Sequence, residues 1–155
     1  MMPPQTDKIA TRSRCRWVTS GGVEIDYQWR GAFDSIEVER LHAAGFERPV
    51  NPANDWWAQV TEHSLGWVLA RDDTGVAVGF VNVAWDGGVH AFILDTVTAA
   101  THLRRGVGTR LIEVAATGAR NANCEWLHVD FEDHLRAFYF DSCGFRPTNA
   151  GLIAL

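Results

Sequence analysis

The segment of this chain best suited to chemistry is Leu103-Arg104-Arg105-Gly106-Val107-Gly108-Thr109. Its two glycines let the backbone approach a ligand without interference from a Cβ atom. The N–H groups and the positive dipole end of a following helix favour an anion there, and the two arginines add forked donors for phosphate. We therefore predict a site for a phosphate-bearing cofactor. The alternative is a tight turn with solvated arginines.

The neighbouring segments place this loop between a strand and a helix. The strand-like run His90–Thr98 precedes it. Behind it, residues recur at i, i+4, i+7 and i+11 on one helix face, namely Val107, Leu111, Val114 and Gly118. The loop is not a Walker A motif, because no Gly-Lys-Ser/Thr follows its glycines. It is not a dinucleotide fingerprint either, because it has only two glycines and no suitably placed acidic partner.

The segments downstream of the loop narrow the choice of cofactor. Residues 125–131 alternate as a strand does, a short amphipathic helix is predicted over residues 135–143, and Gly144-Phe145 follows. Together with the loop, this order resembles the GNAT superfamily of acyl-CoA-dependent N-acyltransferases. The resemblance extends from about Val76 to Pro147. It implies an acetyltransferase, with acetyl-CoA as the acyl donor.

The resemblance also assigns the residues that bind the coenzyme. In the family, backbone N–H groups of the glycine loop bind the pyrophosphate, and the preceding strand binds the pantetheine arm and orients the thioester carbonyl. Leu103 stands where the family loop usually has Gln or Arg, a departure that leaves these backbone contacts in place. The implied residues are Arg104, Arg105, Gly106, Val107, Gly108 and Thr109 for the pyrophosphate, and Thr96, Val97 and Thr98 for the arm.

The expected general acid is displaced by one position. Family members usually carry a tyrosine four residues before the glycine of Gly-Phe, where it protonates the leaving thiolate. Here Phe140 occupies that position and Tyr139 lies one residue earlier. One residue rotates a helical side chain by about 100°. Tyr139 can therefore serve only if the helix is locally irregular or docks differently.

His128 is the first candidate for the base that deprotonates the acceptor, and Asp95 is the alternative. His128 shares a strand face with Trp126 and Asp130, and an imidazole with a pKa of about 6.5 suits proton transfer near neutrality. Asp95 lies two residues before Val97, on the same face and beside the expected thioester. The structural alternatives are a hydrogen-bonded sheet histidine for His128 and a salt-bridged strand residue for Asp95.

Acidic and aromatic residues suggest a cationic acceptor. Carboxylates pair with an ammonium and indoles bind it through cation–π contact. The candidates are Asp130, Glu132 and Asp133 at the end of a strand, and Trp56, Trp57 and Trp85 next to aspartates. For the acidic residues, a helix-start role favoured by the dipole is an equal alternative. We predict a primary amine, on a small molecule or a peptide, that attacks directly without a covalent enzyme intermediate.

Composition excludes several other classes of protein. A formal net charge of −5 disfavours broad nucleic-acid binding. Cys124, His128, His134 and Cys143 lack the paired spacing of a zinc site, so no metal is expected, and no G-x-S-x-G elbow of a hydrolase occurs. No signal peptide or membrane-spanning run is visible, so we expect a cytoplasmic protein with free thiols. A homodimer remains open as its assembly.

The order of predicted elements gives the fold class. We expect a tail over residues 1–14 and one domain over residues 15–155. The domain is α/β or α+β, with a mixed twisted sheet flanked by about four helices. The predicted strands are 23–29, 65–71, 76–85, 90–98 and 125–131, with short final strands at 145–148 and 151–155. The predicted early helices follow caps at Asp34 or Ser35 and at Asp55.

Two other functions stay open at this stage. Phe140 in the usual tyrosine position is compatible with a catalytically weak acyl-CoA-binding module that regulates or senses. The third alternative is an interaction domain that uses exposed tryptophans, with a purely structural glycine loop. Acetyl-CoA binding distinguishes this last alternative from the other two.

Overall fold

The computed structural model describes residues 13–155, which form a single mixed sheet with helices on both faces. The strands lie in the order β1-β2-β3-β4-β5-β6, and all neighbours are antiparallel except β5 and β6, which are parallel. This arrangement confirms the predicted fold class. The strands are β1 (Arg14–Val18), β2 (Glu24–Trp29), β3 (Ser64–Arg71), β4 (Ala77–Trp85), β5 (His90–Thr98) and β6 (Trp126–Val129).

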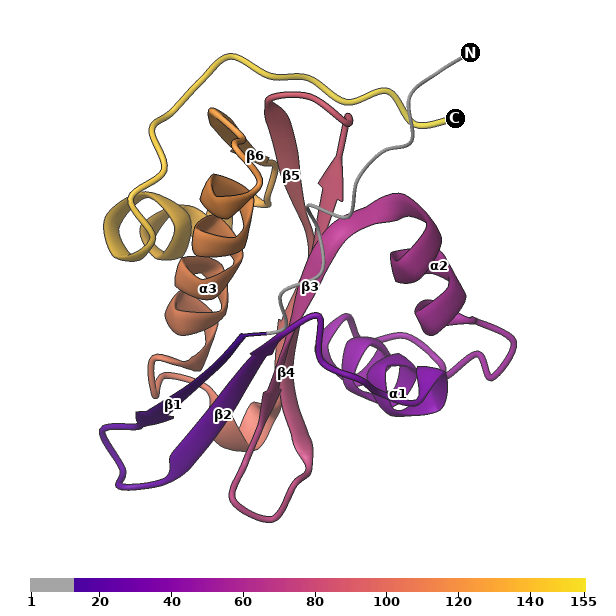
Figure 1. The fold of residues 1–155 in the computed structure, drawn as a ribbon, viewed down its shortest axis with the longest axis vertical. Helices are drawn as coiled ribbons and strands as arrows, with labels where there is room; N and C mark the ends of the chain where they lie inside the picture. Colours follow the sequence, from indigo (N-terminus) through magenta and orange to yellow (C-terminus); the bar gives the residue numbers. More distant parts are fainter. Residues whose placement is uncertain (1–12) are drawn as a thin grey trace.

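Helices cover the two faces of the sheet separately. Figure 1 shows α1 and α2 on one side, and α3 with the C-terminal helical turns on the other. The helices are α1 (Ser35–Gly45), α2 (Trp56–His63) and α3 (Val107–Asn121), with short turns η1 (Ala100–His102) and η2 (Asp133–Leu135) and the π-helix η3 (Ala137–Ser142). Each face has its own apolar core, because each helical layer buries one stripe against the sheet.

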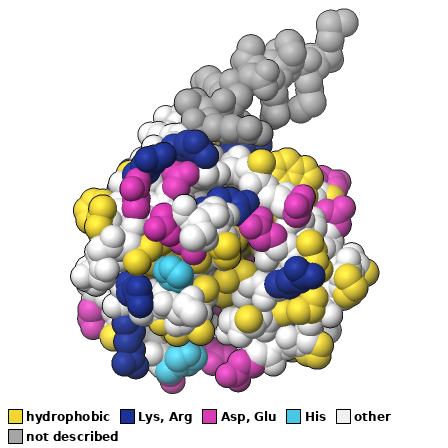
Figure 2. Space-filling model, turned by 90° about the horizontal axis from the view of Figure 1, so that it is seen from below, with side chains coloured by type: hydrophobic (Ala, Val, Ile, Leu, Met, Phe, Trp, Pro, Cys, Tyr) yellow, Lys and Arg dark blue, Asp and Glu magenta, His cyan; other side chains and the backbone are white. Residues whose placement is uncertain are grey.

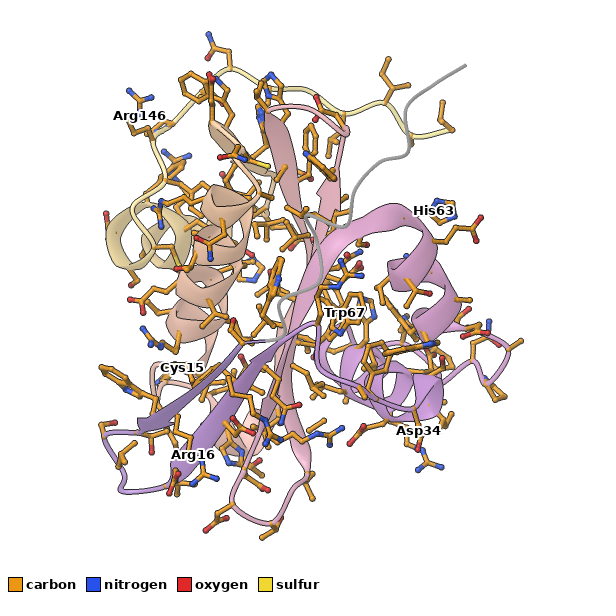
Figure 3. The ribbon with its side chains drawn as sticks, in the orientation of Figure 1. Cys15, Arg16, Asp34, His63, Trp67 and Arg146 are labelled. Atoms are coloured by element: carbon orange, nitrogen blue, oxygen red, sulfur yellow. The ribbon has the colours of Figure 1, made fainter. Side chains whose placement is uncertain are left out.

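The core under α1 and α2 contains four buried aromatic side chains among its ten buried residues. Trp67 of β3 is 2% exposed, and Figure 3 shows it between the sheet and these helices. Its indole donates to the carbonyl of Gly31 at 2.8 Å, and its ring meets Phe33 edge-on at 6.1 Å. A buried indole needs such a partner for its N–H. This layer therefore holds α2 in a defined position over the sheet.

The core under α3 depends on two close approaches to one tryptophan. A Cβ atom added at Gly66 of β3 would lie 2.3 Å from the Trp29 ring, and one added at Gly118 of α3 would lie 2.6 Å from it. Trp29 is 8% exposed. The indole thus fills the space that both glycines leave empty. Gly118 lies on the buried face of α3, where the sequence pattern placed it.

Helix starts were predicted only in part. Asp55 caps α2 as expected, since its carboxylate accepts the Ala58 N–H at 3.0 Å. Asp34 occupies the predicted N-cap position of α1 but forms no side-chain cap there, and Ser35 is engaged with α2. The Ser35 hydroxyl accepts the Trp57 N–H at 2.9 Å and donates to Asp55 at 2.8 Å. Ser35 therefore connects the two helices.

The ends of the described chain differ from the sequence prediction. Residues 1–12 of the expected tail lie outside the described residues, and β1 begins at Arg14. The predicted strands at 145–148 and 151–155 do not form. Pro147 lacks an N–H for a ladder and Gly151 weakens a strand, which favours an irregular path. Between residues 13 and 155, no helix has both the length and the apolar character needed to cross a membrane.

Candidate active site

Strand β6 ends partway along β5, so the two strands pair over only part of the length of β5. They pair from His90–Trp126 to Ile93–Val129, while β5 continues to Thr98. From Leu94 onward, this edge of β5 has no neighbouring strand among the described residues. Such an edge offers backbone N–H and C=O groups to an extended ligand that carries amides. The three residues predicted for the pantetheine arm, Thr96, Val97 and Thr98, lie in this segment.

A β-bulge between β4 and β5 lies just beyond the point where β6 ends. On β4, Phe80 pairs with Val97 and Asn82 with Leu94, so Asp95 and Thr96 together oppose Val81. Asp95 has φ +57°, a left-handed conformation that is costly for a residue with a Cβ atom. Strain of this kind persists where surrounding contacts enforce it and is common at functional sites.

The glycine loop lies at the far end of the free β5 segment. Gly106 has φ +81° and precedes α3, which no side chain caps. The first N–H groups of such a helix have no intrahelical acceptor and can bind an anion. Val107, which is 1% exposed, anchors the first turn in the core, and Thr109 lies in the same turn. Gly106 is thus required by its backbone conformation.

Gly108 has a different role from Gly106. A Cβ atom added at Gly108 would lie 3.1 Å from the ring of Phe138 in η3 and 3.6 Å from Thr98 Oγ1. The absence of a side chain at Gly108 therefore lets η3 pack against the start of α3. Gly106 is thus needed for the backbone turn before α3, and Gly108 for the contact between α3 and η3.

Arg104 and Arg105 are exposed beside the start of α3. Arg104 has φ +58°, and the Arg105 guanidinium reaches the β1–β2 turn, 3.6 Å from a Cβ atom added at Gly21. Among residues 13–155, neither arginine forms an ion pair with a carboxylate. Figure 2, seen from below, shows basic side chains gathered along one edge of the molecule. Both charges are available to a phosphate.

On the α1 side of the sheet, Asp95 is held by two partners. Its Oδ1 lies 3.2 Å from His42 Nε2 of α1, and its Oδ2 accepts from Asn82 Nδ2 of β4 at 3.3 Å. The second ring nitrogen of His42 lies 2.9 Å from Arg48 Nη2. Sequence reasoning missed His42, Asn82 and Arg48. Only Asn82 carried a signal, as a polar residue within an apolar strand, since Arg48 lies in the linker and α1 has several other polar residues beside His42.

A fully buried ion pair extends this network away from the sheet. Glu39 is 0% exposed and binds both terminal nitrogens of Arg48, at 2.6 and 2.9 Å. It also accepts from the Asn51 backbone, the Asn54 amide and the Trp56 indole. The Arg48 guanidinium holds the pKa of Glu39 well below its usual range. Trp56, predicted as an acceptor contact, is 5% exposed and packs in the core under α1 and α2, where an acceptor cannot reach it.

On the α3 side, η3 presents Tyr139 to the bulge. In the π-helical turn, the Cys143 N–H donates to the Phe138 carbonyl five residues earlier. The helix is therefore locally irregular, which is one of the two conditions under which Tyr139 could replace a tyrosine at position 140. Tyr139 is 5% exposed and its ring stacks on Phe131 at 4.6 Å. Burial raises the pKa of the Tyr139 phenol, and the Thr96 hydroxyl opposes that rise. The phenol therefore lies near Thr96 of β5.

Phe140 does not replace Tyr139 at the bulge. Its ring meets Phe131 edge-on at 5.1 Å, and the Arg136 guanidinium lies 5.0 Å from its centroid. These contacts place Phe140 against Phe131 and Arg136 of the same C-terminal region. The residue at the usual tyrosine position thus has a packing role here.

His128 lies at the paired end of β5 and β6. Its Nε2 is 2.8 Å from His90 Nδ1, and its ring stacks on Phe92 at 4.7 Å. Phe92, its partner in register, is three residues before Asp95, a separation of about 10 Å along a strand. The two base candidates therefore occupy different positions, and only Asp95 lies on the segment of β5 beyond the end of β6.

The remaining acceptor candidates do not converge on one point. Trp57 of α2 is half-buried and packs edge-on against Phe33 at 5.2 Å. Trp85 packs on the opposite face, in the core under α3, and its indole donates to the Gly88 carbonyl at 2.9 Å. Of the two, only Trp57 shares the α1 side with Asp95.

The predicted acidic group follows the end of β6 and is exposed. Glu132 pairs with His134 at 3.4 Å, while Asp130 lies close enough to Tyr139 to contribute to the raised pKa of that phenol. Asp133 begins η2. In the described part of the chain, no three His, Cys, Asp or Glu side chains are grouped as metal ligands.

Comparisons with known proteins agree with this geometry. Residues 28–145 match the model of the acetyltransferase (GNAT) family. A search among curated protein sequences finds no significant match.

Solved structures share the fold at low sequence identity. A GNAT-family acetyltransferase from Streptococcus pneumoniae is 23% identical, with a TM-score of 0.66 over 84% of this chain and 97% of that one. Glucosamine-6-phosphate N-acetyltransferase from Arabidopsis thaliana is 14% identical, with a TM-score of 0.66 over 83% and 97%. Aminoglycoside N-acetyltransferase AAC(6')-Iy, solved with CoA, is 17% identical, with a TM-score of 0.67 over 86% and 95%. These likenesses support the fold.

Proposed function

Because the chain belongs to the GNAT acetyltransferase family, we propose that it transfers the acetyl group of acetyl-CoA to a primary amine by direct attack. The observation that carries this proposal is the free edge of β5. It begins at the Asp95–Thr96 bulge and leads to the uncapped start of α3. One end of this edge offers acid–base groups and the other offers anion-binding groups.

The free edge and the loop fit the parts of acetyl-CoA. Five residues from Leu94 to Thr98 extend about 16 Å and can bond the amides of the pantetheine arm. The N–H groups after Gly106 suit the pyrophosphate, as do Arg104 and Arg105, which form no ion pair within residues 13–155. The thioester then lies near the bulge, where both faces of the sheet supply a polar side chain.

Asp95 is the base that the geometry favours. Its carboxylate is 25% exposed, so an acceptor can reach it, and it attracts an ammonium by charge. It takes the amine proton directly or through a water as the nitrogen attacks the thioester carbon. His128, about 10 Å away along the strands, is the alternative base.

Tyr139 is the acid on the other face. Burial keeps its phenol protonated by raising its pKa. A thiol has a pKa near 8.5 and a phenol one near 10, so full transfer to the thiolate is uphill by about 2 kcal/mol or more. Tyr139 therefore acts mainly by donating a hydrogen bond to the sulfur as its charge develops, and water completes the transfer.

The acceptor that suits this site is an amine on an apolar or aromatic body. Phe92 and Leu94 are 39% and 41% exposed, and alternation places them on the α1 side of β5, leading to Asp95. Trp126 and His128 of β6 extend the same surface. A molecule with its ammonium at Asp95 can lay its body along these residues.

A second candidate is an acyl-CoA-binding module with weak catalysis. The packing role of Phe140 favours it, because that residue supplies no proton at the usual position. One experiment separates the two. Acetyl-CoA binding is measured by calorimetry, and free-thiol release is measured with a panel of amines. Binding together with amine-dependent thiol release supports the enzyme, and binding without release supports the module.

A further inference from the structure

We infer that His42 is a positioning residue for Asp95, and that a buried Glu39–Arg48 ion pair locks the ring of His42 in the tautomer that this role requires. The inference deepens the proposed function, since it rests on Asp95 as the base. His42 lies on α1, 53 residues before Asp95, and acts on the reaction only through its contact with Asp95.

The tautomer follows from the chemistry of arginine. A guanidinium has five N–H donors and no acceptor. Arg48 Nη2, at 2.9 Å, must therefore donate to His42 Nδ1, which leaves that nitrogen without a proton. The ring proton is then on Nε2, which donates to Asp95 Oδ1 at 3.2 Å.

Arg48 has no freedom to turn away from His42. Its two terminal nitrogens bind the two oxygens of Glu39, which is fully buried. Glu39 accepts three further N–H donors from the linker and α2, at 2.6, 3.0 and 2.8 Å. A buried carboxylate with this many donors keeps its charge and its orientation. The Glu39–Arg48 ion pair thus fixes the guanidinium, and the guanidinium fixes the tautomer of His42.

Packing and a second donor complete the support of Asp95. The His42 ring stacks on Phe46 at 4.2 Å and lies 4.7 Å from Trp56, which sets its plane. On the other side, Ser64 Oγ donates to Asn82 Oδ1 at 2.6 Å, so Asn82 turns its Nδ2 to Asp95. Each oxygen of the carboxylate therefore receives one N–H, and the remaining lone pairs are left for the acceptor.

The test compares two side chains of equal length at position 42. His42→Gln keeps an N–H that can reach Asp95, and His42→Met has no donor but can pack against the same aromatic rings. The control is Val60→Ala, which cuts a fully buried side chain in the same layer without touching the network. Activity is measured below the melting temperature of every variant, with acetyl-CoA affinity measured by calorimetry.

We expect His42→Met to lower kcat by about 10-fold or more, because a misplaced base loses much of its effect. His42→Gln should keep at least about a third of wild-type kcat. Neither variant should change the acetyl-CoA Kd, and Val60→Ala should melt earlier with unchanged kcat. If His42→Met does not fold, His42→Phe replaces it, because this side chain keeps the stack on Phe46 and also lacks a donor.

Three outcomes would overturn the inference. Wild-type kcat in the folded donor-free variant removes the positioning role. Equal losses of kcat in His42→Gln and the donor-free variant show that the N–H donor is irrelevant. A matching loss of kcat in Val60→Ala shows that the effect comes from lower stability alone. Failure of the proposed function has a different signature, because wild-type protein then binds acetyl-CoA but acetylates no amine, and both proposals fall.

Discussion

Asp95 and Thr96 are consecutive residues of β5, yet their side chains engage opposite sides of the sheet. Asp95 contacts His42 of α1, whereas Thr96 lies beside Tyr139 of η3. The bulge brings both residues opposite Val81. A proton can thus be removed from an amine on one face while a hydrogen bond reaches the leaving thiolate on the other.

Replacing the base should slow the reaction without weakening donor binding. We expect Asp95→Asn to lower kcat/KM by about 10²-fold or more, the scale of a general base, with an unchanged acetyl-CoA Kd. His128→Ala is the comparison and should lose much less. The reverse order, measured by steady-state kinetics with one good amine, would assign the base to His128.

Removing the Tyr139 hydroxyl should reduce turnover rather than abolish it. Tyr139→Phe is expected to lower kcat by about 10-fold, below a full general-acid contribution, because water can substitute. Tyr27→Phe is the matched control, since Tyr27 is the other tyrosine and lies on β2, in the core under α3. Unchanged kcat in both variants would remove Tyr139 from the mechanism.

Stability at high pH should depend on Tyr27. Burial raises the pKa of Tyr27 to about 12, from about 10 when unfolded, and its hydroxyl has no hydrogen-bond partner among the described residues. The unfolded chain loses this proton first, so the contribution of Tyr27 to stability is complete below pH 10 and falls toward pH 12. The loss is about 2 to 3 kcal/mol.

Tyr27→Phe should remove most of that loss, and near pH 7 it should be neutral or stabilising because the hydroxyl is unpartnered. Urea denaturation at pH 9 and pH 11 measures both effects. The same pH-dependent loss of stability in wild type and variant would contradict the assignment to Tyr27.

The glycine loop can be tested by thermal stability. Acetyl-CoA at about 100-fold its Kd should add about 2.7 kcal/mol to the free energy of unfolding. Gly106→Val should abolish this gain, because the substitution strains a backbone with φ +81° and obstructs approach of the phosphates.

Gly75→Val is a matched control for that test. Gly75 has φ +85°, open space around it and a place in the β3–β4 turn, away from the loop. This variant should lose comparable stability and keep the full gain with acetyl-CoA. A melting midpoint of the wild-type protein that does not move with saturating acetyl-CoA would reject the donor site.

The apolar surface beside Asp95 should contribute to acceptor affinity. We expect Phe92→Ala to raise the KM for an aryl or alkyl amine several-fold, since the ring is worth roughly 1 to 2 kcal/mol of contact. Acetyl-CoA affinity should not change. Leu152→Ala, at a residue 81% exposed in the C-terminal segment, is the control for loss of surface apolar area. Equal KM values in all three proteins would place the acceptor elsewhere.

Local patterns in the sequence predicted the parts of the site that local sequence determines. The strand before the loop, Gly106 and the amphipathic stripe of α3 are each specified within a few residues. The Asp55 cap of α2 was likewise predictable, because a cap needs only its own helix.

The acid–base arrangement could not be predicted in this way. The partner of Asp95 is 53 residues away on α1, and the bulge that directs Asp95 toward it arises from the register of β4 and β5. The position of Trp56 next to an aspartate suggested an acceptor contact, but its indole N–H donates to the buried Glu39 carboxylate. Such contacts depend on how layers pack, which periodicity does not encode.

The Trp29 ring lies between Gly66 of β3 and Gly118 of α3, with no space for a Cβ atom on either. Substitutions at positions 29, 66 and 118 are therefore coupled. An alanine at 66 or 118 can be accepted only after residue 29 becomes smaller. Among homologues aligned to this chain, we expect covariation, with small residues at 66 and 118 wherever position 29 is tryptophan, and larger ones where it is not.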